Sequence, residues 1–178
     1  MRLPALEKNI LVYRALQMAL FLFYAEDLRR HLVNSVGASV REGCRNGADL
    51  KGAKLLKAIF RKLEHDQFIS HTESAEVQTL LGHRDKIAHH IYLLTGDVEI
   101  PGRAYGFQRH FKLKYNYESL KKLKGWHEEI VRRLDESYWV TMSPDSLLFE
   151  VAEHAYESEL SSLGKRIARQ IRIRKTHK

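Results

Sequence analysis

The chain has 178 residues, of which 44% are apolar and 29% charged, and it contains only 3 prolines. This length fits one domain, and this composition excludes collagen-like and intrinsically disordered proteins. A single cysteine, Cys44, excludes an internal disulfide and a cysteine-rich zinc site, and it fits a reducing cytoplasm, where we expect the protein. The longest apolar run, Met18 to Ala25, is far shorter than the roughly 18 residues of a membrane span, so we expect no membrane partner.

The formal net charge of +8 is concentrated at the C-terminal end. From Ser161 to Lys178 there are seven Lys and Arg residues and no Asp or Glu, whereas the preceding 160 residues hold 23 basic and 22 acidic residues. Such a segment indicates contact with a polyanion; the alternative is a solvated terminal charge run. We therefore expect a helical bundle domain over residues 1–160 and a basic helical tail over residues 161–178.

The first predicted helix runs from Pro4 to about Val36, because no glycine or proline interrupts this stretch. Its apolar residues recur with a helical period at Leu6, Ile10, Tyr13, Leu16, Leu20 and Phe23. Between Met18 and Ala25 every face is apolar, so this part must be buried on more than one side, by the rest of the bundle or by a second subunit.

Four glycines, Gly37, Gly43, Gly47 and Gly52, then predict a loop. A second helix follows, marked by Leu55, Leu56, Ile59, Phe60 and Leu63. Ser70 and Glu73 have the spacing of a capping box, which predicts the start of a third helix. The buried seam of that helix would be Val77, Leu80, Arg84, Ile87, Ile91 and Leu94.

An irregular insertion near residues 96–114 is predicted by its glycines and proline, and residues 98–100 and 107–113 could pair in it as a short β-ribbon. A fourth helix is expected from about Tyr117 to Tyr138. Ser143, Pro144 and Asp145 then provide a cap and a proline start for a fifth helix that runs toward Arg172. The predicted fold is an all-α bundle of about five helices.

Arg84 is the one charged residue in the seam of the third helix, so its side chain must line a cleft or meet a carboxylate. Around it the sequence reads Gly-His-Arg-Asp-Lys-Ile-Ala-His-His over residues 82–90. This short segment thus carries three imidazoles, a guanidinium and a carboxylate. They belong to His83, His89, His90, Arg84 and Asp85.

Several reaction classes do not fit this cluster. His89 and His90 diverge by about 100° on a helix and no cysteine is near, which disfavours a metal site. The sequence has no Gly-x-Ser-x-Gly elbow and no phosphate-binding glycine-rich loop, which disfavours a serine hydrolase and a P-loop nucleotidase. Histidine with arginine does suit cleavage of RNA by its own 2′-hydroxyl, which needs no metal and no cofactor. A histidine with a pKa near neutrality can move the proton, while the guanidinium holds the phosphate.

The segment from Arg84 to His89 resembles the Arg-x4-6-His motif of the HEPN superfamily, in which a polar residue commonly follows the arginine. The resemblance covers about residues 5–140 and implies an all-α bundle with the motif on a central helix. It also implies a metal-independent endoribonuclease of a toxin–antitoxin, abortive-infection or other antiviral defence system, with RNA as substrate, an antitoxin as partner and one motif from each subunit of a homodimer.

Two features of the motif leave alternatives open. Asp85 stands where asparagine is the most frequent residue in the family, and its added charge could position Arg84 or His89 rather than contact RNA. His89 fits Arg-x4-His, whereas His90 with Tyr92 is similar to the toxin branch whose tyrosine is modified by a partner nucleotidyltransferase. We prefer His89 as the catalytic histidine, and His83 could extend the cleft.

Helical geometry bears on the assembly. Asp85 and His89 lie about 40° apart on one face, whereas His89 is about 140° around the helix from Arg84. Two such helices paired across a two-fold axis would bring two arginines and two histidines into one cleft, so we expect a homodimer. In the alternative without a catalytic site, His89 and His90 are surface residues whose hydrogen bonds are satisfied, and Arg84 forms an ion pair at the edge of the core.

The tail is expected to hold the RNA backbone. Leu163, Ile167 and Ile171 have the spacing to keep this helix docked. Its predicted RNA-binding residues are Lys165, Arg166, Arg169, Arg172, Arg174 and Lys175. Two other functions fit the same sequence: a catalytically silent RNA-binding or toxin-neutralising module on this fold, and a structural helical protein whose tail binds nucleic acid.

Overall fold

The computed structural model describes residues 4–43, 50–89, 118–137 and 144–176, with the backbone alone described at residues 88, 89 and 144–147. Within these ranges the chain is all-α. Its helices are α1 (Ala5–Gly43), α2 (Gly52–His65), α3 (His71–His89), α4 (Glu118–Ser137) and α5 (Pro144–Thr176). The predicted insertion near residues 96–114, with its β-ribbon, lies outside the described residues.

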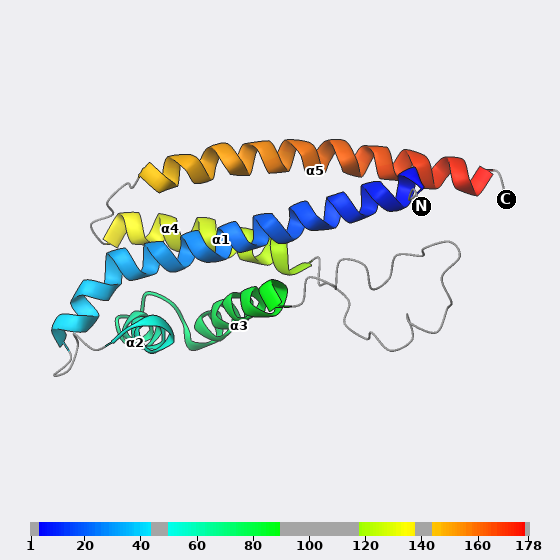
Figure 1. Cartoon of the computed structure of the whole chain (residues 1–178). Helices are drawn as coiled ribbons and strands as arrows, with labels where there is room; N and C mark the ends of the chain where they lie inside the picture. Colours follow the sequence, from blue (N-terminus) through cyan, green and yellow to red (C-terminus); the bar gives the residue numbers. More distant parts are fainter. Residues whose placement is uncertain (1–3, 44–49, 90–117, 138–143, 177–178) are drawn as a thin grey trace.

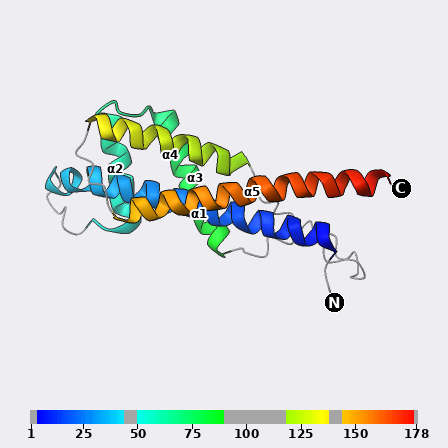
Figure 2. The same cartoon turned by 90° about the horizontal axis from the view of Figure 1, so that it is seen from above.

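Helix α1 is the centre of the bundle. It contacts each of the other four helices, and α5 lies along it for much of its length (Figures 1 and 2). The apolar stretch from Met18 to Ala25 is therefore covered within the chain: Phe21 and Ala25 are fully buried, whereas Phe23 keeps 40% of its surface exposed. The prediction that this stretch is buried on more than one side is confirmed, with the other helices of the bundle as its cover.

The predicted end of the first helix was wrong. Helix α1 continues past Val36 and Gly37 to Gly43, so it ends seven residues later than the glycine pattern suggests. Gly37 is buried where α1 meets α2, and a Cβ there would lie 3.8 Å from Ile59 and 3.9 Å from Leu55. Packing between helices outweighs the cost of about 1 kcal/mol that one glycine imposes on a helix interior.

Local hydrogen bonds determine both ends of the segment that connects α2 to α3. After α2, Gln67 has a φ of 59°, and the amides of Gln67 and Phe68 donate to the carbonyls of Glu64 and Leu63. These two bonds form a Schellman motif, which satisfies the last carbonyls of the helix. The capping box of α3 is confirmed, because the Ser70 amide donates to Glu73 Oε2 at 2.7 Å and the Glu73 amide donates to Ser70 Oγ at 3.2 Å.

The last two helices agree with the sequence pattern. Helix α4 spans the predicted range within one residue at either end, and α5 begins at Pro144 and extends four residues beyond Arg172. Two polar contacts join the C-terminal part of α5 to the beginning of α1. Asn9 donates to Gln170 at 3.0 Å, and Arg174 donates to the buried carboxylate of Glu7 at 2.8 Å.

Candidate functional site

Arg84 lies near the C-terminal end of α3, with its side chain 40% exposed and held by two carboxylates. Its Nη2 is 3.0 Å from Glu26 Oε2 on α1, and its Nη1 is 3.8 Å from Asp85 Oδ1. The expectation that Arg84 either lines a cleft or meets a carboxylate is met by the ion pair with Glu26. The guanidinium is thereby fixed at the surface between α1 and α3.

The other residues of the cluster are distributed around the same end of α3. Asp85 is 73% exposed in its side chain, so it faces solvent beside Arg84. His83 points to α4, where Ser119 Oγ lies 3.3 Å from its Nδ1. Burial, and then the charge of Lys86, lowers the pKa of His83, so this imidazole is neutral at pH 7.

His89 is the last residue of α3, and only its backbone is described. His90 and Tyr92 lie outside the described residues. The structure therefore brings Arg84, Asp85 and Glu26 together, and the place of the His89 imidazole stays a prediction. Helix geometry still puts Asp85 and His89 one turn apart on the same face.

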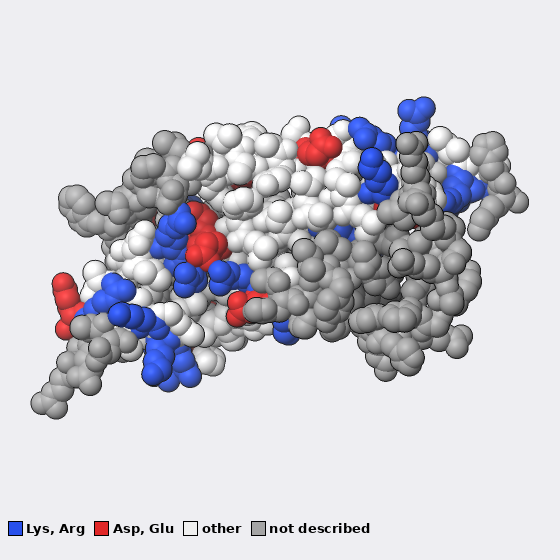
Figure 3. Space-filling view, viewed as in Figure 1, with Lys and Arg blue, Asp and Glu red and all other residues white. Residues whose placement is uncertain are grey.

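The six predicted RNA-binding residues of the tail are all exposed on the C-terminal part of α5. Leu163 is only 2% exposed and docks this part of the helix, whereas Ile171 is 40% exposed. Arg174 differs from the others because it is engaged by Glu7. Figure 3 shows basic side chains over this end of α5 and, at the opposite end of the same face, over the region where α1 ends and α2 lies.

A buried polar cluster joins α1 to α4. Asp27 Oδ2 lies 2.7 Å from His127 Nε2 and 3.2 Å from His31 Nε2, and Asp27 is only 7% exposed. Burial alone would raise the pKa of Asp27, but the hydrogen bonds and charges of His127 and His31 outweigh it and hold that pKa well below its usual range. Since the carboxylate and His127 are both buried, we assign the cluster a structural role.

A second polar network extends the cluster toward α5. The Tyr24 hydroxyl donates to Glu153, and Lys124 on α4 donates to both Glu153 and Glu157. Burial and the hydrogen bond to Glu153 raise the pKa of Tyr24, so its hydroxyl stays protonated. The network ties α1, α4 and α5 together by charge-assisted hydrogen bonds.

Two residues of these sites, Glu26 and Asp27, were not predicted from the sequence. Glu26 ends the all-apolar stretch of α1 and Asp27 follows it, and the Asp27–His31 spacing of four residues on a mostly buried helix was the available signal. No spacing rule pairs Glu26 with Arg84, because the two residues lie on different helices.

No family model, no curated protein and no solved structure matches this chain. Among the helices that the structure describes, none is long and apolar enough to cross a membrane. Within the same residues, no three His, Cys, Asp or Glu side chains are grouped as metal ligands.

Proposed function

We propose that this chain is a metal-independent endoribonuclease of a defence or toxin–antitoxin system, with Arg84 and His89 as its catalytic residues and Asp85 in support. The observation that carries the proposal is the placement of Arg84. A guanidinium in an apolar seam emerges at the surface, beside Asp85 and in the last helical turns that also carry His89. Such a planar, permanently charged donor binds phosphate oxygens as well as carboxylates, so an RNA phosphate is a suitable ligand for it.

The proposed reaction needs only these side chains and the RNA. His89 accepts the proton of a ribose 2′-hydroxyl while the 2′-oxygen attacks the adjacent phosphorus. The bond from phosphorus to the 5′-oxygen breaks, a protonated histidine supplies the proton to that leaving oxygen, and the products are a 2′,3′-cyclic phosphate and a 5′-hydroxyl. Arg84 stabilises the charge that accumulates on the phosphoryl oxygens in the transition state.

The ion pairs of Arg84 also favour a second candidate function. A guanidinium already neutralised by Glu26 at 3.0 Å must exchange a carboxylate for a phosphate before it can assist cleavage. If that exchange does not occur, the chain is a catalytically silent RNA-binding or toxin-neutralising module on the same fold.

Incubation of the purified protein with labelled single-stranded RNA in EDTA separates the two functions. The nuclease is expected to give products with 2′,3′-cyclic phosphate ends, and Arg84→Ala is expected to remove them. Arg133→Ala, on α4, is the matched control, because its guanidinium is also partly exposed and pairs with two carboxylates, those of Glu129 and Glu73. Binding without cleavage by the unmodified protein would leave the silent module as the function.

A further inference from the structure

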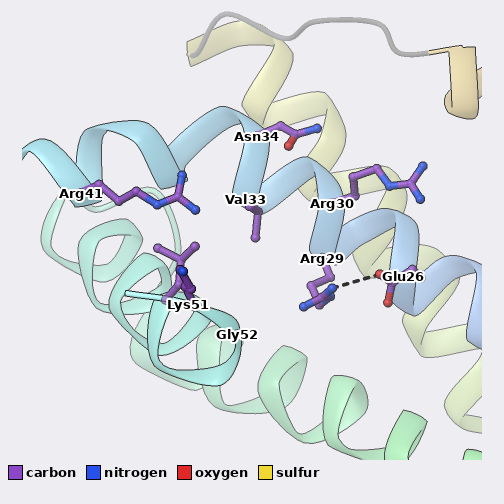
Figure 4. A pocket seen from close by; sticks show the side chains of 9 residues that line it. Glu26, Arg29, Arg30, Val33, Asn34, Arg41, Lys51 and Gly52 are labelled. Carbon is purple, nitrogen blue, oxygen red and sulfur yellow. Dashed lines mark hydrogen bonds and ion pairs between the residues drawn. The ribbon is translucent and has the colours of Figure 1, made fainter. Parts of the chain in front are cut away.

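A hollow of about 250 Å³ lies between the C-terminal half of α1 and the first turn of α2 (Figure 4). Arg29 and Arg41 extend into it from α1, on either side of Val33, and Lys51 lies opposite them. Its lining residues are Glu26, Arg29, Arg30, Val33, Asn34, Arg41, Lys51, Gly52 and Leu55. Three cationic side chains, those of Arg29, Arg41 and Lys51, thus share the hollow with Glu26 as its one lining carboxylate.

The positive charge of this hollow is only partly compensated. Glu26 accepts a hydrogen bond from Arg29 at 3.1 Å, whereas no carboxylate of the described residues pairs with Arg41 or Lys51. The first turn of α2 contains no acidic residue, and Lys51 makes no side-chain capping bond to it, so the positive end of that helix adds to the same potential. Cations that line the same hollow repel one another, and a multiply charged anion bound among them offsets that repulsion.

The size and the polarity of the hollow limit the class of ligand that it can bind. Pockets for apolar small molecules measure roughly 300 to 1,000 Å³ and are lined mainly by hydrophobic side chains. This hollow is smaller, and four of its nine lining residues are arginine or lysine. Guanidinium and ammonium groups at this density match phosphate oxygens, which accept several charge-assisted hydrogen bonds at once.

Glu26 connects the hollow to the candidate catalytic residue. Its Oε1 accepts from Arg29 at 3.1 Å, and its Oε2 lies 3.0 Å from Arg84 Nη2. A chain of phosphates seated on Arg84 therefore has a second cationic position directly beside it. A lone phosphate would occupy only one of the two positions, so this adjacency favours a polymer.

We propose that the hollow lined by Arg29, Arg41 and Lys51 binds a backbone phosphate of single-stranded RNA next to the phosphate held by Arg84. The choice of RNA as the polymer rests on the proposed function, whereas the affinity for phosphate rests on the hollow itself. In this arrangement the hollow positions the substrate strand and takes no part in bond cleavage.

The test measures binding of labelled single-stranded 2′-O-methyl RNA, which cannot be cleaved through its 2′-oxygen, by fluorescence anisotropy at several salt concentrations. The pocket variant is Arg41→Gln with Lys51→Gln. The matched control is Lys57→Gln with Arg61→Gln, which removes the same charge from exposed positions of α2 about 200° and 240° around the helix from Leu55. Circular dichroism establishes that both variants keep the helical fold.

We expect the pocket variant to lose roughly 10-fold in affinity at 150 mM salt and to flatten the log–log salt slope by about 0.7, since the hollow neutralises one phosphate and each neutralised phosphate of a single strand contributes about 0.7. The control should change both quantities much less. Equal binding by the pocket variant and the control would overturn the proposal. A melting temperature raised by inorganic phosphate in the unmodified protein alone, with RNA affinity equal in both variants, would overturn RNA as the ligand.

Cleavage is measured separately on unmodified RNA. If the protein binds 2′-O-methyl RNA through the hollow but cuts no RNA, the proposed nuclease function is refuted and the proposed phosphate site is supported. If the protein cuts RNA and its pocket variant binds RNA normally, the phosphate site is refuted and the nuclease function is supported.

Discussion

His89 and His90 are adjacent in sequence, and on a helix two adjacent residues diverge by about 100°, so we expect the two histidines to have separable roles. We expect His89→Ala to reduce RNA cleavage by at least 100-fold with the fold intact, because general acid–base catalysis by one side chain contributes about 10² to 10⁴ in rate. His90→Ala should be milder. Single-turnover cleavage assays on both variants measure this difference. A dead His90 variant beside an active His89 variant would transfer the catalytic role to His90, with Tyr92 as a modification site.

Asp27 makes stability depend on pH. Its folded-state pKa lies below that of the unfolded chain, so its contribution is complete above about pH 4 and is lost as the pH falls through the folded-state value. Asp27→Asn should lower the free energy of unfolding by about 2 to 3 kcal/mol at pH 7, since it weakens two buried hydrogen bonds.

Urea denaturation at pH 7, 5 and 3 measures this effect. The difference between the unmodified protein and Asp27→Asn should be smaller at pH 3 than at pH 5. Asp135→Asn, at an exposed position of α4, is the control and should leave the pH profile unchanged. A difference that stays constant down to pH 3 would contradict the role assigned to Asp27.

The features recovered from the sequence are those set by local chemistry. The capping box of Ser70 and Glu73 and the proline start of α5 depend on residues within one turn, so their positions could be predicted. The prediction that the helix ends at Gly37 was wrong, because Gly37 is held in the helix by packing against Ile59 and Leu55, which are distant in sequence. For the same reason, periodicity singled out Arg84 but gave no indication that Glu26 is its partner.

The end of α2 offers a direct test of helix termination. Gln67 has the left-handed conformation, which costs a residue with a Cβ about 1 kcal/mol. Gln67→Gly should therefore stabilise the protein by about that amount. Gln78→Gly, in the interior of α3, is the opposite control and should destabilise it by about 1 kcal/mol. Thermal unfolding of both variants checks the sign, and a destabilised Gln67→Gly protein would refute this account.

The C-terminal part of α5 is expected to bind the RNA backbone without regard to sequence. Deletion after Gly164 should weaken RNA binding and flatten its salt dependence, while cleavage at saturating RNA survives. The deletion also removes the partner of Glu7, so a second variant keeps Arg174 and replaces Arg166, Arg169 and Arg172 by glutamine. In that variant, the slope of log affinity against log salt concentration should fall in magnitude by about 2. Unchanged affinity and slope in both variants would show that this segment serves another partner.

The expected homodimer rests on the candidate site, because the other helices of the chain bury most of the apolar stretch of α1 and leave Phe23 partly exposed. Arg84 and His89 lie about 140° apart on a straight helix, so a composite site needs a second α3. Light scattering should give roughly twice the chain mass of 20.8 kDa. A monomer at micromolar concentration that still cuts RNA would show that one chain suffices.

The central position of α1 governs the order in which the protein can fold during synthesis. Its helix is made first, but Glu7 and Asn9 meet their partners Arg174 and Gln170 only after more than 160 further residues have been added. At roughly 5 to 20 residues per second, the nascent chain carries an incompletely covered apolar helix for about 8 to 30 seconds. The α1–α5 pair can therefore form only after α5 has been synthesised, and a chain stalled before α5 would expose the apolar surface of α1 that α5 covers.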